Sequence, residues 1–130
     1  MVATISSMTE APRALRVSAV SIDGPDHVVL ATFYAELLDG TVLWTHEHAS
    51  AVDVGGLVLV TQSVTDHREP EWPGAAIVHL DLTAAADDLD AMVARAESLG
   101  ARLADPQPDP RWRVLLDPAG HPFCITPFAP

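Results

Sequence analysis

Residues 26–40, DHVVLATFYAELLDG, and residues 87–100, DDLDAMVARAESLG, decide the fold because they are two versions of one helix. Each stretch opens with an aspartate, Asp26 or Asp87, a residue type that suits a helix N-cap. Apolar residues recur at helical spacing in both stretches, and a glycine ends each of them. Because the two aspartates lie 61 residues apart, the pattern indicates that the chain contains one structural unit twice.

Short, β-branched, apolar segments surround each helix and predict strands. One strand precedes each helix and three follow it, so each half has the order β-α-β-β-β and the fold class is α+β. Tight turns join the three later strands, which indicates an antiparallel meander. The predicted strands are Arg16–Asp23, Thr41–His48, Ala49–Val54 and Leu57–Ser63 in the first half, and Ala75–Leu82, a short strand at Leu103, Arg111–Leu116 and Pro122–Thr126 in the second.

The expected domain organisation is a flexible tail over residues 1–14 and a single domain over residues 15–130. The tail has no basic run followed by an apolar core, so it does not have the pattern of a signal peptide. Within the domain, unit one spans 15–64 and unit two spans 75–127. The polar, proline-containing segment 65–74 connects the units.

Alternation along each strand separates a helix-covered face from a face that lines a cleft. In the strand 75–82 this places Val78, Leu80 and Leu82 under the helix, and Ile77, His79 and Asp81 in the cleft. In the last strand, Phe123 and Ile125 pack while Cys124 points inward. Because the unit is duplicated, equivalent positions are expected to face each other and to converge on one site. Those positions are Ser18, Gln62, His79 and Cys124.

Composition excludes several classes of partner and chemistry. The formal net charge of −11 disfavours nucleic acid and anionic membranes, since both would be repelled. The sequence contains no lysine, which rules out a Schiff-base or P-loop lysine. No stretch is long and apolar enough to span a membrane. Cys124 is the only cysteine, so no intrachain disulfide forms, and we expect a cytoplasmic protein.

Three phrases, in this order and spacing, resemble the vicinal oxygen chelate superfamily, which includes glyoxalase I, bleomycin-resistance proteins and extradiol dioxygenases. They are FYAELL (33–38), HLDL (79–82) and DPAGHPFC (117–124). The resemblance is strongest to the glyoxalase-like branch and covers roughly residues 15–127. It implies two tandem units that form an incomplete eight-stranded barrel around a cleft, and it implies a homodimer.

In metal-dependent members of the superfamily the ligands are His or Gln, Glu, His and Glu, from the first and last strand of each unit. The resemblance carries these positions to Ser18 (or its neighbour Ala19), Gln62, His79 and Cys124. Gln62 and Cys124 replace carboxylates and Ser18 is a poor ligand, whereas divalent ions usually need several charged or imidazole groups. We therefore expect no firmly bound metal; a divalent ion, if present, would be held by His79, Gln62 and Cys124.

Other side chains suggest further chemistry. His79 is a candidate general base with Asp81 orienting it, against the alternative of a structural histidine beside a strand-end carboxylate. Trp72 and Trp112 are candidate walls for a planar ligand. The remaining pairs are weaker candidates: Cys124 with His79 as thiolate and imidazole, Arg111 with Arg113 as an anion clamp, and His46 with His48 as metal ligands.

Three functions remain open from the sequence. The first is a glyoxalase-like protein that binds a small organic molecule in the cleft, lined by Ser18, Gln62, His79, Cys124, Trp72 and Trp112, with His79 and Asp81 as catalytic candidates. The second is a metal-dependent lyase, isomerase or dioxygenase. The third is an interaction module whose cleft is vestigial.

Overall fold

The computed structural model describes residues 15–74 and 78–128. The predicted tail over 1–14 and the predicted strand residues 75–77, including Ile77 of the expected cleft face, lie outside these ranges. Neither described α-helix is long and apolar enough to cross a membrane.

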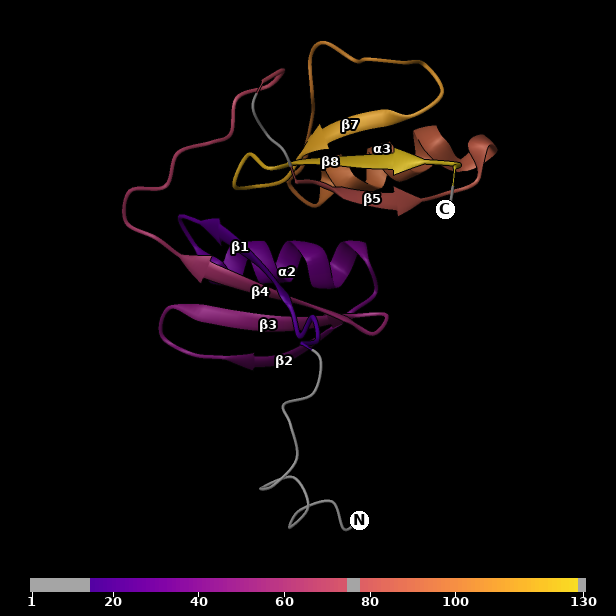
Figure 1. The fold of residues 1–130 in the computed structure, drawn as a ribbon. Coiled ribbons are helices and arrows are strands. Elements are labelled where there is room, and N and C mark those ends of the chain that lie inside the picture. The colour runs from indigo at the N-terminus through magenta and orange to yellow at the C-terminus, as the bar shows by residue number, and fades with distance from the viewer. Residues whose placement is uncertain (1–14, 75–77, 129–130) are drawn as a thin grey trace.

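Each unit is a four-stranded sheet with one α-helix, and the two sheets repeat one topology (Figure 1). The sheet orders are β1-β4-β3-β2 and β5-β8-β7-β6, and in each the first strand runs parallel to the last. The duplication and the α+β class are therefore confirmed. The elements are β1 Val20–Gly24, α2 His27–Leu37, β2 Thr41–Thr45, β3 Ala49–Val54 and β4 Leu57–Ser63 in unit one, then β5 Leu80–Thr83, the 3-10 turn η1 Ala86–Asp88, α3 Leu89–Ser98, β6 Arg102–Leu103, β7 Arg113–Leu116 and β8 Pro122–Thr126 in unit two.

The strands β3, β4 and β8 have the predicted ends, while the first strand of each unit is shorter than predicted. β1 begins at Val20 rather than at Arg16. β5 begins at Leu80, and Val78 is 77% exposed rather than packed under the helix. The paired part of β1 begins with Val20 opposite Leu59, and that of β5 begins with Leu80 opposite Phe123.

The two helices begin differently despite their similar sequences. Asp26 caps α2 as predicted, since its Oδ1 accepts hydrogen bonds from the amides of Val28 (2.9 Å) and Val29 (3.2 Å). The prediction that Asp87 caps the second helix is wrong. Asp87 lies inside the turn η1, and Asp88 precedes α3 with a helical backbone and makes no side-chain cap bond. An N-cap needs an extended backbone to reach the free amides, and Asp88 lacks one.

Gly40 was expected to end the first helix, but it does not supply the left-handed residue at the helix end. The left-handed residue after α2 is Asp39, with φ of 52°, and not the glycine. A Cβ atom at Gly40 would lie 2.6 Å from the backbone oxygen of Asp53 in β3. Gly40 therefore allows the chain to pass close to β3 as it enters β2.

Both units contribute to one hydrophobic core, which contains α2, α3 and the helix-covered faces of both sheets. In Figure 1, α2 lies behind β1 and next to β4, on the side of β3 and β2 that is toward unit two. The ring of Phe123 in β8 lies 5.9 Å from Phe33 and 6.4 Å from Tyr34, both in α2. Burial of these apolar surfaces is the main force that joins the units. The buried members of the core are Leu30, Phe33, Tyr34, Leu59, Leu89, Val93, Ala96, Ala101, Leu115, Ala119, Phe123 and Ile125.

A buried polar contact reinforces this junction. The hydroxyl of Tyr34 donates a 2.6 Å hydrogen bond to Oδ2 of Asp117, in the turn between β7 and β8. The other oxygen of Asp117 accepts from the amides of Ala119 and His121. Asp117 thus orders its own turn and ties that turn to the helix of the other unit.

Because the units meet through their helix-covered faces, the other faces of the two sheets are directed away from the shared core. Within the described residues no strand of one unit pairs with a strand of the other. The eight strands therefore form two separate sheets and no closed barrel.

Candidate functional site

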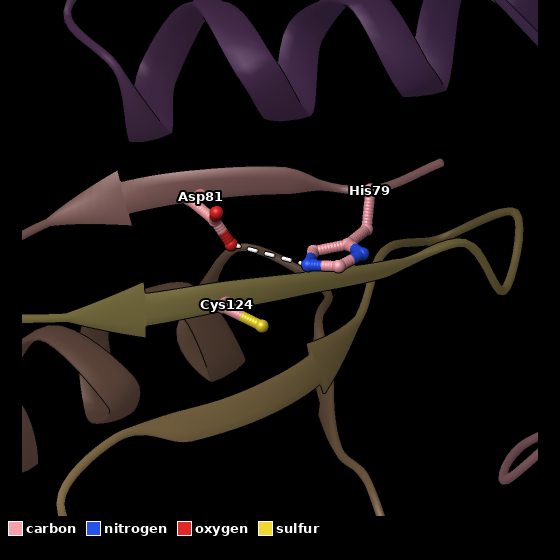
Figure 2. Close-up of side chains that lie close together, drawn as sticks. All are labelled: His79, Asp81 and Cys124. Carbon is pink, nitrogen blue, oxygen red and sulfur yellow. Dashed lines mark ion pairs between the residues drawn. The ribbon is translucent and has the colours of Figure 1, made fainter. Parts of the chain in front are cut away.

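The main polar site is a hollow on the face of the unit-two sheet that is not covered by α3. Figure 2 shows three of its side chains, His79, Asp81 and Cys124. We call it the β8 hollow; its volume is about 310 Å³. Two aromatic rings and four side chains with polar atoms line it. These residues are His79, Asp81, Trp112, Cys124, Thr126 and Phe128.

Strand register brings the central residues together. Asp81 in β5 lies directly opposite Cys124 in the parallel strand β8. Phe123 and Ile125 point into the core, so alternation turns Cys124 to the other face, as predicted. His79 precedes β5 by one residue and its Nε2 lies 3.2 Å from Oδ1 of Asp81 (Figure 2). The structure thus places the imidazole and the carboxyl group of the predicted pair in contact.

The electrostatics of the hollow keep the cysteine protonated. Burial raises the pKa of the Cys124 thiol to about 11, and the charge of Asp81 and a hydrogen bond with it act in the same direction. A thiol with so high a pKa is a poor nucleophile at neutral pH. Cys124 can therefore contact a ligand or donate a weak hydrogen bond, and His79 and Asp81 are the remaining ionisable groups that line the hollow.

The hollow also contains a possible set of metal ligands. One ligand atom from each of His79, Asp81 and Cys124 lies within 4.8 Å of the other two. A nitrogen, an oxygen and a sulfur at this spacing fit zinc, which commonly takes three protein ligands and leaves one position open. The predicted ligand set contained Gln62 where the structure has Asp81, because Gln62 lies in β4 of the other unit and does not line the hollow.

The expected convergence of four equivalent positions does not occur within the described part of the chain. Ser18 is exposed and precedes β1, and Gln62 is exposed opposite Asp23 in the unit-one sheet. Of the four, His79 and Cys124 line the β8 hollow and the other two do not. Gln62 lies on the unit-one sheet and Cys124 on the unit-two sheet, and neither of the two openings described in this section is lined by both.

Of the two tryptophans predicted to line the ligand site, only Trp112 lines the β8 hollow. Trp112, just before β7, lines the β8 hollow, and its ring makes a T-shaped contact with Phe128 at 6.4 Å. Trp72 does not line it: in the connector its indole N–H donates a 2.9 Å hydrogen bond to the carbonyl of Pro106. Trp72 therefore fastens the connector to the loop before β7.

The arginines and histidines that the sequence offered as an anion clamp and as metal ligands contact other side chains. The guanidinium of Arg111 donates to both carboxylate oxygens of Asp109, and Arg113 lies 3.5 Å from Asp90. His46 stacks on Trp44 at 4.8 Å. His48 is exposed beside Glu47.

A second opening, the inter-unit cleft, lies between the first strands of the two units and has a volume of about 250 Å³. His79 lines it as well as the β8 hollow, so the two openings adjoin. His121 also lines the cleft, and its Nε2 contacts the carbonyl of Asp23 at 2.5 Å. This opening between the halves is lined by Val20–Asp23 of β1 and by residues 78–80 around the start of β5, and of the four positions expected to converge in a cleft it contains His79.

Two lining residues of the β8 hollow, Thr126 and Phe128, were missed in the sequence. Alternation beyond Cys124 would have indicated Thr126, which follows it by two positions on the same strand. Phe128 lies after the end of β8, where strand periodicity no longer applies. Its ring reaches the hollow through the contact with Trp112.

Comparison with known proteins places the chain in a family. The sequence profile of the glyoxalase-like domain matches residues 19–126. Among curated proteins none matches the chain in sequence.

Solved structures of low sequence identity share the fold. One is a mutant of the fosfomycin resistance protein FosX from Listeria monocytogenes, complexed with Mn(II) and 1S,2S-dihydroxypropylphosphonic acid (TM-score 0.71, 13% identity, 90% of this chain and 93% of that chain). A second is FosX from Mesorhizobium loti (TM-score 0.66, 14% identity, 90% and 94%). A third is a glyoxalase/bleomycin resistance protein/dioxygenase family enzyme from Burkholderia phytofirmans PsJN (TM-score 0.66, 20% identity, 83% and 94%).

The profile covers most of the chain, and the structural matches extend over both β-α-β-β-β units. The chain therefore belongs to the glyoxalase-like domain family, within the vicinal oxygen chelate superfamily.

Proposed function

We propose that this protein binds a small organic molecule in the β8 hollow, without a firmly bound metal. The observation that carries the proposal is the meeting of the His79–Asp81 pair with the aromatic rings of Trp112 and Phe128 in one hollow. Ligand sites commonly combine apolar or aromatic walls with a few polar groups that fix orientation. The volume of about 310 Å³ is at the lower end of the range for such sites.

Each lining group has a role in this proposal. Trp112 and Phe128 supply surface against which a planar ligand stacks. The imidazole of His79 and the carboxyl group of Asp81 form hydrogen bonds with polar atoms of the ligand. If the protein also catalyses a reaction, these two groups are the ones that transfer a proton, because burial holds the thiol of Cys124 protonated.

A ligand screen by thermal shift tests this proposal, with His79→Ala as the site variant. A matched control is His48→Ala, which removes an exposed imidazole in unit one. A ligand present at about 100 times its Kd stabilises the folded state by roughly 2.7 kcal/mol. We expect hits that stabilise the wild type and His48→Ala and that have no effect on His79→Ala. A screen without hits would favour an interaction module, and hits retained by His79→Ala would place binding elsewhere.

A metal-dependent lyase, isomerase or dioxygenase is the second candidate. One observation favours it: ligand atoms of His79, Asp81 and Cys124 lie within 4.8 Å of one another. A divalent ion held by these residues would polarise neighbouring oxygens of a substrate. The thiol must lose its proton to become a ligand, and its raised pKa makes this costly.

Elemental analysis of protein purified without chelator separates the two candidates. A stoichiometric content of Zn, Ni, Mn or Fe, with a gain in thermal stability when the ion is restored, would favour the enzyme. Asp81→Asn should then lower the metal content. Gln62→Ala should leave the metal content unchanged, since Gln62 is separate from the three donors. Protein without metal and without a gain in stability favours the binding protein.

We also propose a homodimer and a cytoplasmic location, with neither nucleic acid nor membrane as partner. The net charge of −11 disfavours phosphate backbones and anionic lipids. The edge strand β2 is exposed along its length and carries Val42, Leu43 and Trp44, apolar side chains that a second copy would cover. Light scattering coupled to gel filtration tests the dimer, and a monomeric mass at micromolar concentration would contradict it.

A further inference from the structure

The charge of the β8 hollow restricts the kind of ligand that it can hold. Asp81 is the acidic residue among the lining residues, and its side chain is 63% exposed. Of the arginines that the structure describes, none lines the hollow. The two that lie nearest in sequence to Trp112 are already engaged, Arg111 with Asp109 and Arg113 with Asp90. An anionic ligand would therefore meet the carboxylate of Asp81, while the nearest guanidinium, that of Arg111, is already neutralised by Asp109.

The charge of Asp81 also acts on Cys124, its neighbour in the hollow. After burial, the next cause that raises its pKa is the negative charge of Asp81. The same field that disfavours a thiolate disfavours a carboxylate or phosphate of a ligand and attracts a cation.

The aromatic walls give independent support. The guanidinium carbon of Arg111 lies 5.4 Å from the ring centroid of Trp112 and 5.7 Å from that of Phe128. A planar cation is thus already in contact with the two rings that line the hollow. Such rings attract cations through the negative potential of their faces.

We infer that the ligand of the β8 hollow is an organic cation, such as a planar amidinium or aromatic amine. Its N–H groups donate to the carboxylate of Asp81 and its apolar body contacts Trp112 and Phe128. This inference rests on the proposed small-molecule binding and adds the charge of the ligand to it.

Three probes of the same shape and different charge test the inference: benzamidine, benzamide and benzoate, each with its naphthalene counterpart. Ligand-observed NMR titrations would measure their affinities for the full chain. We expect the amidines to bind more tightly than the amides, and the amides more tightly than the carboxylates. Added salt should weaken binding of the amidines in particular, because salt screens exposed charges.

Two variants test whether the carboxylate of Asp81 is the charge that attracts the amidine. Asp81→Asn should weaken amidine binding roughly two- to fivefold, the range for an exposed ion pair, and leave amide binding unchanged. Asp23→Asn is the matched control. Asp23 lies opposite Gln62 in the sheet of unit one, and Asp81 lies opposite Cys124 at the equivalent place in the sheet of unit two. The Asp23→Asn substitution therefore changes the net charge of the protein by the same amount, but on the other sheet.

The outcomes separate this inference from the proposed function. Carboxylates that bind as tightly as amidines, or an Asp81→Asn variant with unchanged amidine affinity, would overturn the cationic ligand while small-molecule binding stands. An equal loss in Asp23→Asn would indicate an effect of net charge alone and also overturn it. If none of the probes binds the wild type, the cationic ligand is overturned, and the thermal-shift screen described above decides the proposed function separately.

Discussion

Replacing Tyr34 with phenylalanine tests whether the two units are held together by the contact described above. Tyr34 is 1% exposed and Asp117 is fully buried, and the hydrogen bond between them joins residues 83 positions apart. The substitution keeps the aromatic ring and its packing on Phe123 but removes the only hydroxyl donor recorded for Oδ2 of Asp117 among the described residues. Hydrogen bonds to charged groups contribute about 1.5–3 kcal/mol, and an oxygen left buried without a donor bears the full desolvation cost.

We therefore expect Tyr34→Phe to lower the free energy of unfolding by about 2–3 kcal/mol. For a chain of 130 residues this corresponds to a fall in Tm of roughly 10 °C. Urea unfolding, followed by circular dichroism, measures the change. Thr61→Val is a useful comparison: Thr61 donates a buried hydrogen bond to the carbonyl of His27 within unit one, so its loss should cost about 1 kcal/mol.

A double-mutant cycle with Asp117→Asn identifies the pair itself. The coupling free energy between the two positions should exceed about 1 kcal/mol. A loss below about 0.5 kcal/mol in Tyr34→Phe would refute the reasoning, because it would mean that the hydroxyl exchanges its partner for water at no cost.

Three further outcomes follow from the same structure. Burial and then the charge of Asp117 raise the pKa of Tyr34, so its hydroxyl contributes stability that is fully present below about pH 10 and is lost as pH rises above that value. Alkaline unfolding of the wild type should show a larger loss than Tyr34→Phe, in which the raised pKa of Cys124 still contributes a loss. The Cys124 thiol has a pKa of about 11, so it should react slowly with Ellman's reagent near neutrality and faster as pH rises toward that value. Asp81→Asn should raise the reaction rate at a fixed pH, because it removes a negative charge that raises the pKa of the thiol. A fast reaction of the wild type at neutral pH would contradict the assigned environment of Cys124. Asp26→Ala should destabilise the protein by about 1 kcal/mol in urea unfolding, whereas Asp87→Ala should have little effect because Asp87 caps no helix.

The fold was predictable because its signals are local. Helical spacing, turn residues and alternation depend on neighbours in the sequence, and they identified both units and the face of β8 on which Cys124 lies, opposite Phe123 and Ile125. The failures occurred where a tertiary contact decides the result. Val78 has the apolar character of a strand residue, but it lies beyond the reach of the partner strand β8 and is exposed.

The candidate site was predictable only in part. Strand alternation placed Cys124 and Asp81 on one face, and the pair of His79 with Asp81 follows from their spacing of two residues. The inclusion of Ser18 and Gln62 assumed that equivalent positions of duplicated units face one another. That assumption concerns the orientation of the units, which no local pattern encodes.

The sequence by itself determined two β-α-β-β-β units, their helices and strands, and the side of each strand that is apolar. Only the tertiary structure decided how the units meet, because that depends on which large side chains interlock across long separations. The rings of Phe33 and Tyr34 pack on Phe123, and Tyr34 reaches Asp117 in the other unit. This packing directs the polar faces of the two sheets away from the common core. Strand register within unit two brings His79, Asp81 and Cys124 to one hollow, and Gln62 lies on the sheet of unit one.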